Sequence, residues 1–442
     1  MPDKLPTVVI VGGGFGGLAA AKALRNTAAN VVLIDRSNHH LFQPLLYQVA
    51  ISVLTPGQIG SPIRGILRKQ QNTTVILGEV TGVDRNKKYV LVSSTDRTNV
   101  PIEYDYLILA TGATHSYFGH PEFERFAPGM KSLADAVAAR NKILAAFEQA
   151  EAEEDPSRHR DLLTFVLIGG GPTGVEMAGA IATLVRLTLR TDYRRIDPSL
   201  ARVILLDRGS RVLGTFSEDL SRAAKARLER LGVEVRLGVS ADQIDANGVT
   251  VAGERIASKA VMWTAGVAPS PAGKWLNAET DRAGRVRVQP DLSVPNSPEV
   301  YVVGDTASLD QKGKPLPGVA QVAIQQGRYV GRLIERRIAG KPAPAPFRYF
   351  DKGNMAVVGK GFAILESHKL RMSGFLAFLA WAGVHLQFLA QGSNRASIFL
   401  QWFWNYIMGQ QGSRIIVNHH CAEQSVHCAA EAASVPEPLV KL

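Results

Sequence analysis

The chain has 442 residues, the length of about three ordinary domains, and its 46% hydrophobic and 20% charged residues are typical of a globular protein. The net charge of +11 favours anionic partners, but the basic residues form no long run, so we expect no nucleic-acid partner. The only two cysteines, Cys421 and Cys428, exclude a fold built on disulfides and indicate a reducing compartment.

The first elements of the chain predict a nucleotide-binding unit. Residues 7–11 are a β-branched strand, an alanine-rich helix follows, and residues 30–36 form a second strand. Gly12, Gly14 and Gly17 lie at the turn, where they permit the bend, the approach of a pyrophosphate and close packing of helix on strand. Asp35 ends the second strand, where its carboxylate can accept hydrogen bonds from both ribose hydroxyls. The pattern therefore predicts a dinucleotide site.

Residues 40–64 are apolar but are interrupted by prolines and glycines. A core helix or strand would not be broken in this way, so we interpret the stretch as one wall of the cofactor pocket. Short strands are expected within 75–92, and residues 104–113 form a buried strand that ends in a Thr-Gly turn.

The same plan then recurs. A helix is expected over 132–154, and a second glycine motif, Gly169, Gly171 and Gly174, begins another βαβ unit. Its second strand, 201–209, carries Asp207 near its end. Two motifs predict two dinucleotides, and the natural pair is FAD with a nicotinamide nucleotide, because flavins accept hydride from nicotinamides. Asp207 favours NADH, although the neighbouring Arg208 leaves NADPH possible.

A further strand at 299–307 carries Gly304 and Asp305, whose carboxylate can hold the ribityl hydroxyls of a flavin. A helix expected over about 317–339 would direct its N-terminus at the pyrimidine edge and stabilise a reduced, anionic flavin. The predicted fold is α/β, with two Rossmann-like dinucleotide-binding domains, one for FAD and one for NAD, plus C-terminal membrane-associating helices.

Four stretches carry a more specific resemblance: "HLFQPLLYQVA", "GGGPTGVEMAGAIA", "AQVAIQQG" and "DKGNMAVVGKGFAI". On these, over about residues 6–415, the chain resembles the type II NADH:quinone oxidoreductases, single-subunit flavoproteins that do not pump protons. The resemblance implies noncovalent FAD, a flavin beside the stretch after "HLFQP", and a quinone tunnel lined by the "AQVAIQQG" helix. No cysteine precedes Cys421, so electrons cannot pass from the flavin to a neighbouring protein disulfide and must leave to a diffusible acceptor.

Four residues are candidates for catalysis. Glu176 lies in the first turns of the helix after the second motif, and the resemblance implies that it positions the nicotinamide or tunes the flavin; capping of the helix N-terminus is the alternative. Gln321 and Gln325 are four residues apart, so they share a helix face and could hydrogen-bond a quinone carbonyl. Lys360 could stabilise a reduced quinone or flavin, or be an ordinary solvated lysine. No general acid is evident.

The residues assigned to FAD are Gly12, Gly14, Phe15, Gly16, Gly17, Asp35, Arg36, Pro44, Tyr47, Val80, Ala110, Thr111, Gly112, Gly304, Asp305, Ala320 and Gln321. Those assigned to NADH are Gly169, Gly171, Pro172, Thr173, Gly174, Glu176, Asp207, Ala265 and Gly266. The predicted domains are FAD binding (1–120 and 266–342), NADH binding (121–265), a membrane-anchoring region (343–415) and a flexible tail (416–442).

The C-terminal region carries a membrane signal. Met372–Asn394 contains 23 residues without a formal charge, and residues 396–413 form a second uncharged stretch. We interpret them as two amphipathic helices in the plane of an anionic membrane, with Gln387, Gln391 and Asn394 as a polar edge. A dimer interface, helices that cover the core and a single membrane span are the alternatives. Because a targeting segment is not evident, we expect the cytoplasmic face of a bacterial inner membrane.

The tail contains His419, His420, Cys421, His427 and Cys428, but their spacing matches no standard zinc site, so no metal is expected. The predicted partners are NADH, a membrane quinone (ubiquinone or menaquinone), anionic lipid and a second copy of the chain in a homodimer. Two other functions stay open: a reductase with a soluble acceptor, and an NADH-responsive redox sensor at the membrane.

Overall fold

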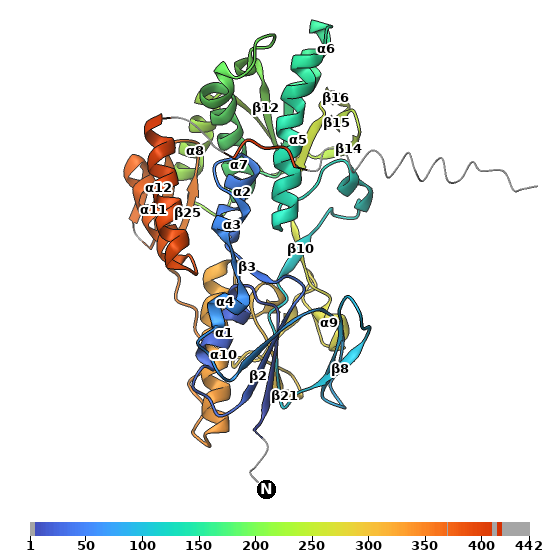
Figure 1. Cartoon of the computed structure of the whole chain (residues 1–442), viewed down its shortest axis with the longest axis vertical. Coiled ribbons are helices and arrows are strands. Elements are labelled where there is room, and N and C mark those ends of the chain that lie inside the picture. The colour runs from blue at the N-terminus through green and yellow to red at the C-terminus, as the bar shows by residue number, and fades with distance from the viewer. Residues whose placement is uncertain (1–4, 369, 409–412, 418–442) are drawn as a thin grey trace, which may run out of the picture.

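The computed structural model describes residues 5–368, 370–408 and 413–417. A mostly parallel sheet forms the centre of its lower unit (Figure 1). Its strand order is β20 (Ser293–Val294), β21 (Ser297–Val302), β9 (Tyr106–Leu109), β1 (Thr7–Val11), β2 (Asn30–Asp35) and β5 (Thr73–Leu77). Only β20 runs antiparallel to its neighbour. The strands are apolar along their length because helices or smaller sheets cover both faces. The chain thus returns to its first sheet after residue 292.

Two helices on this sheet approach each other unusually closely. They are α1 (Phe15–Ala23) and α10 (Ala320–Ile338). A Cβ atom added to Gly327 would lie 2.1 Å from the carbonyl oxygen of Gly16, and one added to Gly331 would lie 2.6 Å from Cβ of Ala23. Glycine is needed at both positions because any side chain would push the two helices apart.

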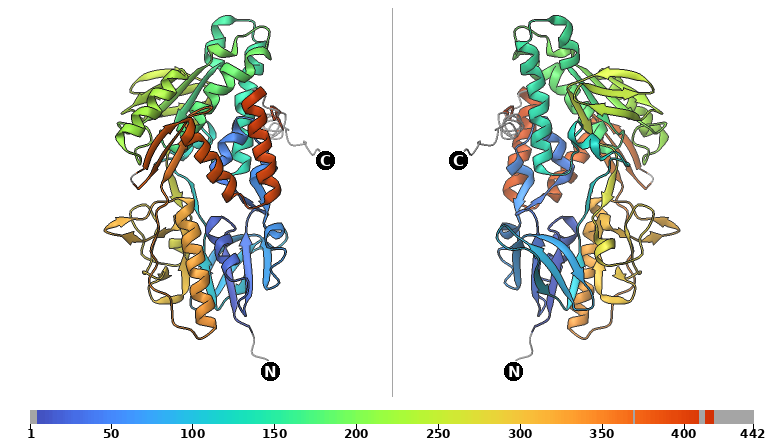
Figure 2. Two further views of the ribbon diagram at one scale, coloured as in Figure 1. Left: turned by 90° about the vertical axis from the view of Figure 1, so that its left-hand side faces the viewer. Right: turned by 90° about the vertical axis from the view of Figure 1, so that its right-hand side faces the viewer.

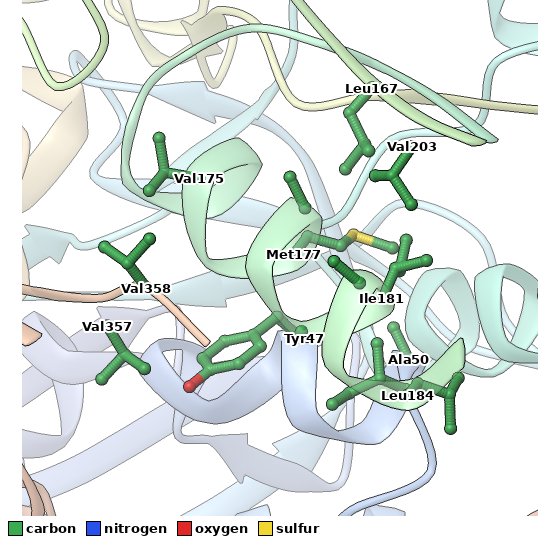
Figure 3. Close-up of a cluster of buried hydrophobic side chains, with 14 of the residues drawn as sticks. Tyr47, Ala50, Leu167, Val175, Met177, Ile181, Leu184, Val203, Val357 and Val358 are labelled. Atoms are coloured by element: carbon green, nitrogen blue, oxygen red, sulfur yellow. The ribbon is translucent and has the colours of Figure 1, made fainter. Parts of the chain in front are cut away.

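The upper unit repeats the plan with a four-stranded, wholly parallel sheet. Its order is β13 (Val233–Leu237), β12 (Arg202–Asp207), β11 (Thr164–Ile168) and β17 (Ala260–Trp263). Helix α7 (Pro172–Thr183) packs on it, and Figure 3 shows Met177 and Ile181 of α7 between the sheet residues Leu167 and Val203 and the side chains Tyr47 and Ala50. Helices α5 (Leu133–Ala152) and α8 (Glu218–Arg230) complete this unit.

Two antiparallel strands, β10 (Ala113–His115) and β18 (Val267–Pro269), pair where the chain passes between the two units. Smaller antiparallel sheets flank the units: β6 (Glu79–Asp84), β7 (Tyr89–Ser93) and β8 (Val100–Glu103); and β14 (Ala241–Asp245), β15 (Gly248–Val251) and β16 (Glu254–Ala257).

The interrupted stretch 40–64 forms short elements only, as its prolines and glycines predict. They are β3 (His39–Leu41), the 3₁₀ helix η1 (Gln43–Leu45), α2 (Leu46–Ala50), α3 (Pro56–Ile59), β4 (Gly60–Pro62) and α4 (Ile63–Leu67). In Figure 1 this segment joins the lower unit to the upper one, and α2 contacts α7.

The C-terminal region differs from the sequence prediction. Its first uncharged stretch is not one helix, because Met372 belongs to the third strand of the sheet β25 (Asn354–Val357), β26 (Ala363–Ser367) and β27 (Leu370–Gly374). Helix α11 (Phe375–Phe388) begins after Gly374, whose φ of 100° favours glycine, and α12 (Gly392–Met408) is a separate helix. The expected helix over 317–339 likewise begins later, at Ala320. In the described part of the chain, no helix combines the length and apolar character needed to cross a bilayer.

The exposed faces of α11 and α12 show how their apolar and polar side chains are arranged. Their exposed side chains are largely apolar, including Leu376 (67% exposed) and Leu400 (63% exposed). Polar groups of α12 instead form hydrogen bonds with the segment 40–64. The Trp402 indole donates to Oε1 of Gln48 at 2.7 Å, and the Asn394 amide donates to the carbonyl of Gln58 at 2.9 Å. The predicted polar edge is divided, because only Gln387 lies in α11. The helices therefore have an apolar outer face and polar anchors on the inside, the reverse of a water-exposed helix.

Candidate active site

One cavity of about 1470 Å³ extends from the first glycine motif to the second unit. The first unit contributes the turn Gly12–Gly16, Asp35 and the ends of β9 and β21. The segment Phe42–Pro44 forms another side, as predicted for the interrupted stretch. Pro172, Thr173 and Glu176 reach it from the first turns of α7. Both units therefore border one continuous space.

The geometry of the first motif matches a dinucleotide cradle. Gly12 has a φ of 103°, and a Cβ there would lie 2.3 Å from the Ala110 carbonyl oxygen, so only glycine fits. A Cβ on Gly14 would meet nothing within 4 Å, which leaves open space at the start of α1 for a phosphate group. A Cβ on Gly17 would lie 1.8 Å from the Gly12 carbonyl oxygen, so this glycine permits close packing of helix on turn.

The two acidic residues occupy equivalent positions in the two units. Oδ2 of Asp35 accepts from the Gly13 N–H at 2.5 Å, and Oδ2 of Asp207 accepts from the Gly170 N–H at 2.5 Å. The other oxygen of each accepts a backbone N–H two residues onward, at 2.6 Å in both cases. A carboxylate has about four acceptor positions, so two remain on each for ribose hydroxyls. The duplication predicted from the sequence thus extends to individual hydrogen bonds.

Glu176 lies between the main cavity and a second, smaller cavity of about 130 Å³, and it lines both. Its Oε1 accepts from the Val357 N–H at 3.3 Å. Burial raises the pKa of the Glu176 carboxyl to about 8, since the one hydrogen bond that favours the ionised form offsets little of the desolvation. The carboxyl is therefore mostly protonated at neutral pH.

The two glutamines of the predicted quinone-binding face have different surroundings. Gln321 lines the main cavity near Gly304 and Asp305. Gln325 does not line it, because both ends of its amide bind the backbone of Phe350: Nε2 donates to the carbonyl at 2.9 Å, and Oε1 accepts from the N–H at 3.0 Å. The structure thus brings Gln321 to the site, whereas Gln325 fastens α10 to the chain before β25.

Lys360 lies in the second cavity with Tyr47 and two tryptophans, Trp381 and Trp402. Its Nζ is 5.1 Å from the centroid of the Tyr406 ring and 3.4 Å from the Asn405 carbonyl oxygen. Lys360 therefore makes a cation–π contact with α12 and does not lie beside the first glycine motif. Desolvation raises the pKa of the buried Tyr47 hydroxyl well above its usual value.

The main cavity brings together most of the predicted residues. Those that line it are Gly12, Gly14, Phe15, Gly16, Asp35, Arg36, Pro44, Ala110, Thr111, Gly112, Pro172, Thr173, Glu176, Gly304, Asp305, Ala320 and Gln321. Those that do not are Gly17, Tyr47, Val80, Gly169, Gly171, Gly174, Asp207, Ala265, Gly266, Gln325 and Lys360. Val80 instead packs in the apolar core behind the first sheet.

Several lining residues had no sequence signal. Lys131, Met355 and His385 all line the cavity and come from segments far apart in the chain. Burial lowers the pKa of Lys131, and it lowers the pKa of His385 to about 4, so the imidazole is neutral.

Comparison with known proteins assigns the family. Residues 6–327 match the family described as pyridine nucleotide-disulphide oxidoreductase. A relative in Mycobacterium tuberculosis, "Type II NADH:quinone oxidoreductase Ndh", is 45% identical over 98% of this chain and 96% of its own. The chain belongs to the type II NADH:quinone oxidoreductases.

A second M. tuberculosis member of these oxidoreductases, NdhA, is 44% identical over 93% of this chain and 89% of its own. The fold matches that of NDH2 from Plasmodium falciparum, solved in complex with NADH, with a TM-score of 0.84 at 19% identity, over 94% of this chain and all of that one. The chain has no cysteine before Cys421, and both of its cysteines lie outside the described residues.

Proposed function

We propose that this protein binds FAD noncovalently, oxidises NADH and reduces a membrane quinone, ubiquinone or menaquinone, without pumping protons. The observation that carries the proposal is the single cavity that reaches from the first glycine motif to Glu176 and Gln321. Two nucleotides placed on the two motifs would extend their reactive ends toward the same space. That arrangement suits an electron donor and an electron acceptor that share one cofactor.

The residues present fit FAD. The open space at Gly14 and the free acceptor positions of Asp35 suit a pyrophosphate and a ribose, and Asp305 lines the cavity where a ribityl chain would pass. Bound there, FAD would supply the capacity to take a hydride from a nicotinamide and to release two electrons to a quinone. Asp207, equivalently placed in the second unit, favours NADH, since a 2′-phosphate would meet its carboxylate.

The protein's own groups then position the substrates. Glu176, protonated at neutral pH, offers an O–H donor where the nicotinamide and the acceptor would approach. The Gln321 amide offers an N–H donor to a quinone carbonyl at the start of α10. Helix α10 also directs its positive N-terminal end toward the cavity, which would stabilise negative charge there. Lys360 is assigned to the second cavity and not to the flavin.

We further propose that the apolar outer faces of α11 and α12 lie in the membrane interface, at the cytoplasmic face of a bacterial inner membrane, and that the protein is a homodimer. The exposed apolar side chains on α11 and α12 support an interfacial position, because soluble monomers rarely expose such a patch. The return of the chain to its first sheet supports a discontinuous FAD domain (1–120 and 266–342) around an NADH domain (121–265), followed by the anchoring region 343–415.

The absorbance of the purified protein tests the central proposal. We expect a yellow chromophore that NADH bleaches without oxygen and that a short-chain quinone restores, with fast steady-state turnover. Stoichiometric bleaching that then stalls would favour a redox sensor, and restoration by soluble acceptors but not by quinone would favour a soluble-acceptor reductase. A folded preparation that binds no added flavin would refute all three.

A further inference from the structure

A groove beside the main cavity lies between α1 and α10, and it shares Phe15, Ile324 and Phe388 with that cavity. Its volume is about 420 Å³, and it carries Lys22 on α1 with Arg328 and Arg332 on α10. The two arginines are four residues apart and so share one helix face. The glycine contact of Gly327 and Gly331 brings α1 close enough to add Lys22 to them. We name these three residues and the space between them the basic groove.

Positive charges outnumber negative ones in the basic groove. Within the described residues, no ion pair joins Lys22, Arg328 or Arg332 to a carboxylate, and Glu335 is the one acidic residue that lines the groove. The pKa of Lys22 is lowered, because its ammonium group is partly desolvated and because Arg328 and Arg395 lie near it. Cations held together in this way repel one another unless an anion joins them.

Apart from His40, the remaining walls of the groove are apolar. Phe15, Leu18 and Ile324 line it from α1 and α10, and Phe388 and Ala390 close it at the turn between α11 and α12. That turn leads to the exposed apolar side chains of the two C-terminal helices. Figure 2 shows α11 and α12 on the same side of the molecule as α10. An anionic group in the groove therefore lies beside a surface suited to hydrocarbon.

We propose that the basic groove binds the phosphate of an anionic phospholipid, with the acyl chains passing over Phe388 onto the apolar faces of α11 and α12. Clustered cations without ion pairs would bind the phosphate of the lipid, and the apolar path over Phe388 would hold its acyl chains. A free anion would use only the cations and not the apolar walls. The inference rests on the proposed membrane association and adds a specific site to it.

Vesicle sedimentation of the flavin-loaded protein tests the site. Each cation near an anionic surface contributes about fivefold in binding, so Arg328→Gln/Arg332→Gln should bind vesicles containing phosphatidylglycerol about 25-fold more weakly. The matched control is Arg97→Gln/Arg282→Gln, which removes the same charge from two exposed arginines outside the groove and should change binding less than twofold. Glu335→Gln removes the one carboxylate and should strengthen binding severalfold.

The outcomes separate the possible failures. Equal losses of vesicle binding in the two double variants would show unspecific electrostatics and overturn the proposed lipid site. The site would also be overturned if millimolar inorganic phosphate stabilised the wild type but not the Arg328→Gln/Arg332→Gln variant while both bound vesicles equally well. If the wild type binds neither neutral nor anionic vesicles, the proposed membrane association itself fails. Flavin content and NADH oxidation with a water-soluble quinone should be unchanged in both double variants, which confirms that they fold.

Discussion

The contact between α1 and α10 gives a sharp prediction for Gly327→Ala. The added Cβ would lie 2.1 Å from the Gly16 carbonyl oxygen, whereas ordinary contacts begin at 3.4 Å, so the helices must separate by about 1 Å. The Gly16 oxygen belongs to a helical backbone, and the new Cβ is bonded directly to another, so neither atom can rotate away. Overpacking of this kind costs about 3 kcal/mol, and the helix propensity gained from alanine returns about 1 kcal/mol. We expect a net loss of about 2 kcal/mol.

Gly383→Ala is the matched control, since Gly383 lies inside α11 and a Cβ there would meet nothing within 4 Å. It should gain up to about 1 kcal/mol. At about 2–4 °C per kcal/mol for a unit of some 200 residues, thermal release of flavin fluorescence should occur about 4–8 °C lower in Gly327→Ala and slightly higher in Gly383→Ala. Because Gly16 belongs to the first glycine motif, Gly327→Ala should also retain less flavin. Equal midpoints for the two variants would refute the contact.

Three further substitutions test the site. Glu176→Gln should remove a pH dependence of the free energy of unfolding. The pKa of the Glu176 carboxyl is 4.5 in the unfolded chain and about 8 in the folded protein, so its contribution to stability is fully present below pH 4.5 and is lost as pH rises through 8. The loss is at most on the order of 5 kcal/mol, and the thermal midpoint of the wild type, but not of the variant, should fall between pH 5 and pH 9. Gln321→Ala should slow reoxidation of the reduced flavin by quinone at least tenfold in stopped flow while leaving its reduction by NADH nearly unchanged, and equal losses would contradict the quinone assignment. Asp207→Asn should raise the KM for NADH tenfold or more, as expected for loss of charge-assisted hydrogen bonds, with normal flavin content; reduced flavin content would show that the two sites are not separate.

The sequence predicted the parts of the site that depend on local chemistry. The glycine motifs, Asp35 and Asp207 could be recognised because each role requires a particular residue at a fixed distance from a strand end. Their equivalent hydrogen bonds confirm that the second unit repeats the first. Glu176 and Gln321 were predicted because they lie in recognisable motifs, and both line the main cavity.

Residues brought to the site by tertiary structure were predicted less well. Val80 follows β5 of the first sheet in sequence but packs behind that sheet, and nothing local distinguishes the two faces. Lys131 and Met355 reach the cavity from segments whose positions depend on the whole fold. Two helices were predicted in the C-terminal region, but their bounds were wrong. Uncharged runs do not reveal that β27 ends at Gly374 or that the extended backbone at Leu389 ends α11 before Arg395.

The hydrogen bond from Trp402 to Gln48 has a consequence for the order in which the molecule is assembled. Gln48 is synthesised early, yet its buried amide acquires this donor only from a residue 354 positions later. Asn394 similarly reaches Gln58 across 336 positions. While the ribosome is still translating the middle of the chain, the segment between the two units lacks its outer supports, so stable uptake of the prosthetic group should follow release of the finished polypeptide rather than accompany its elongation.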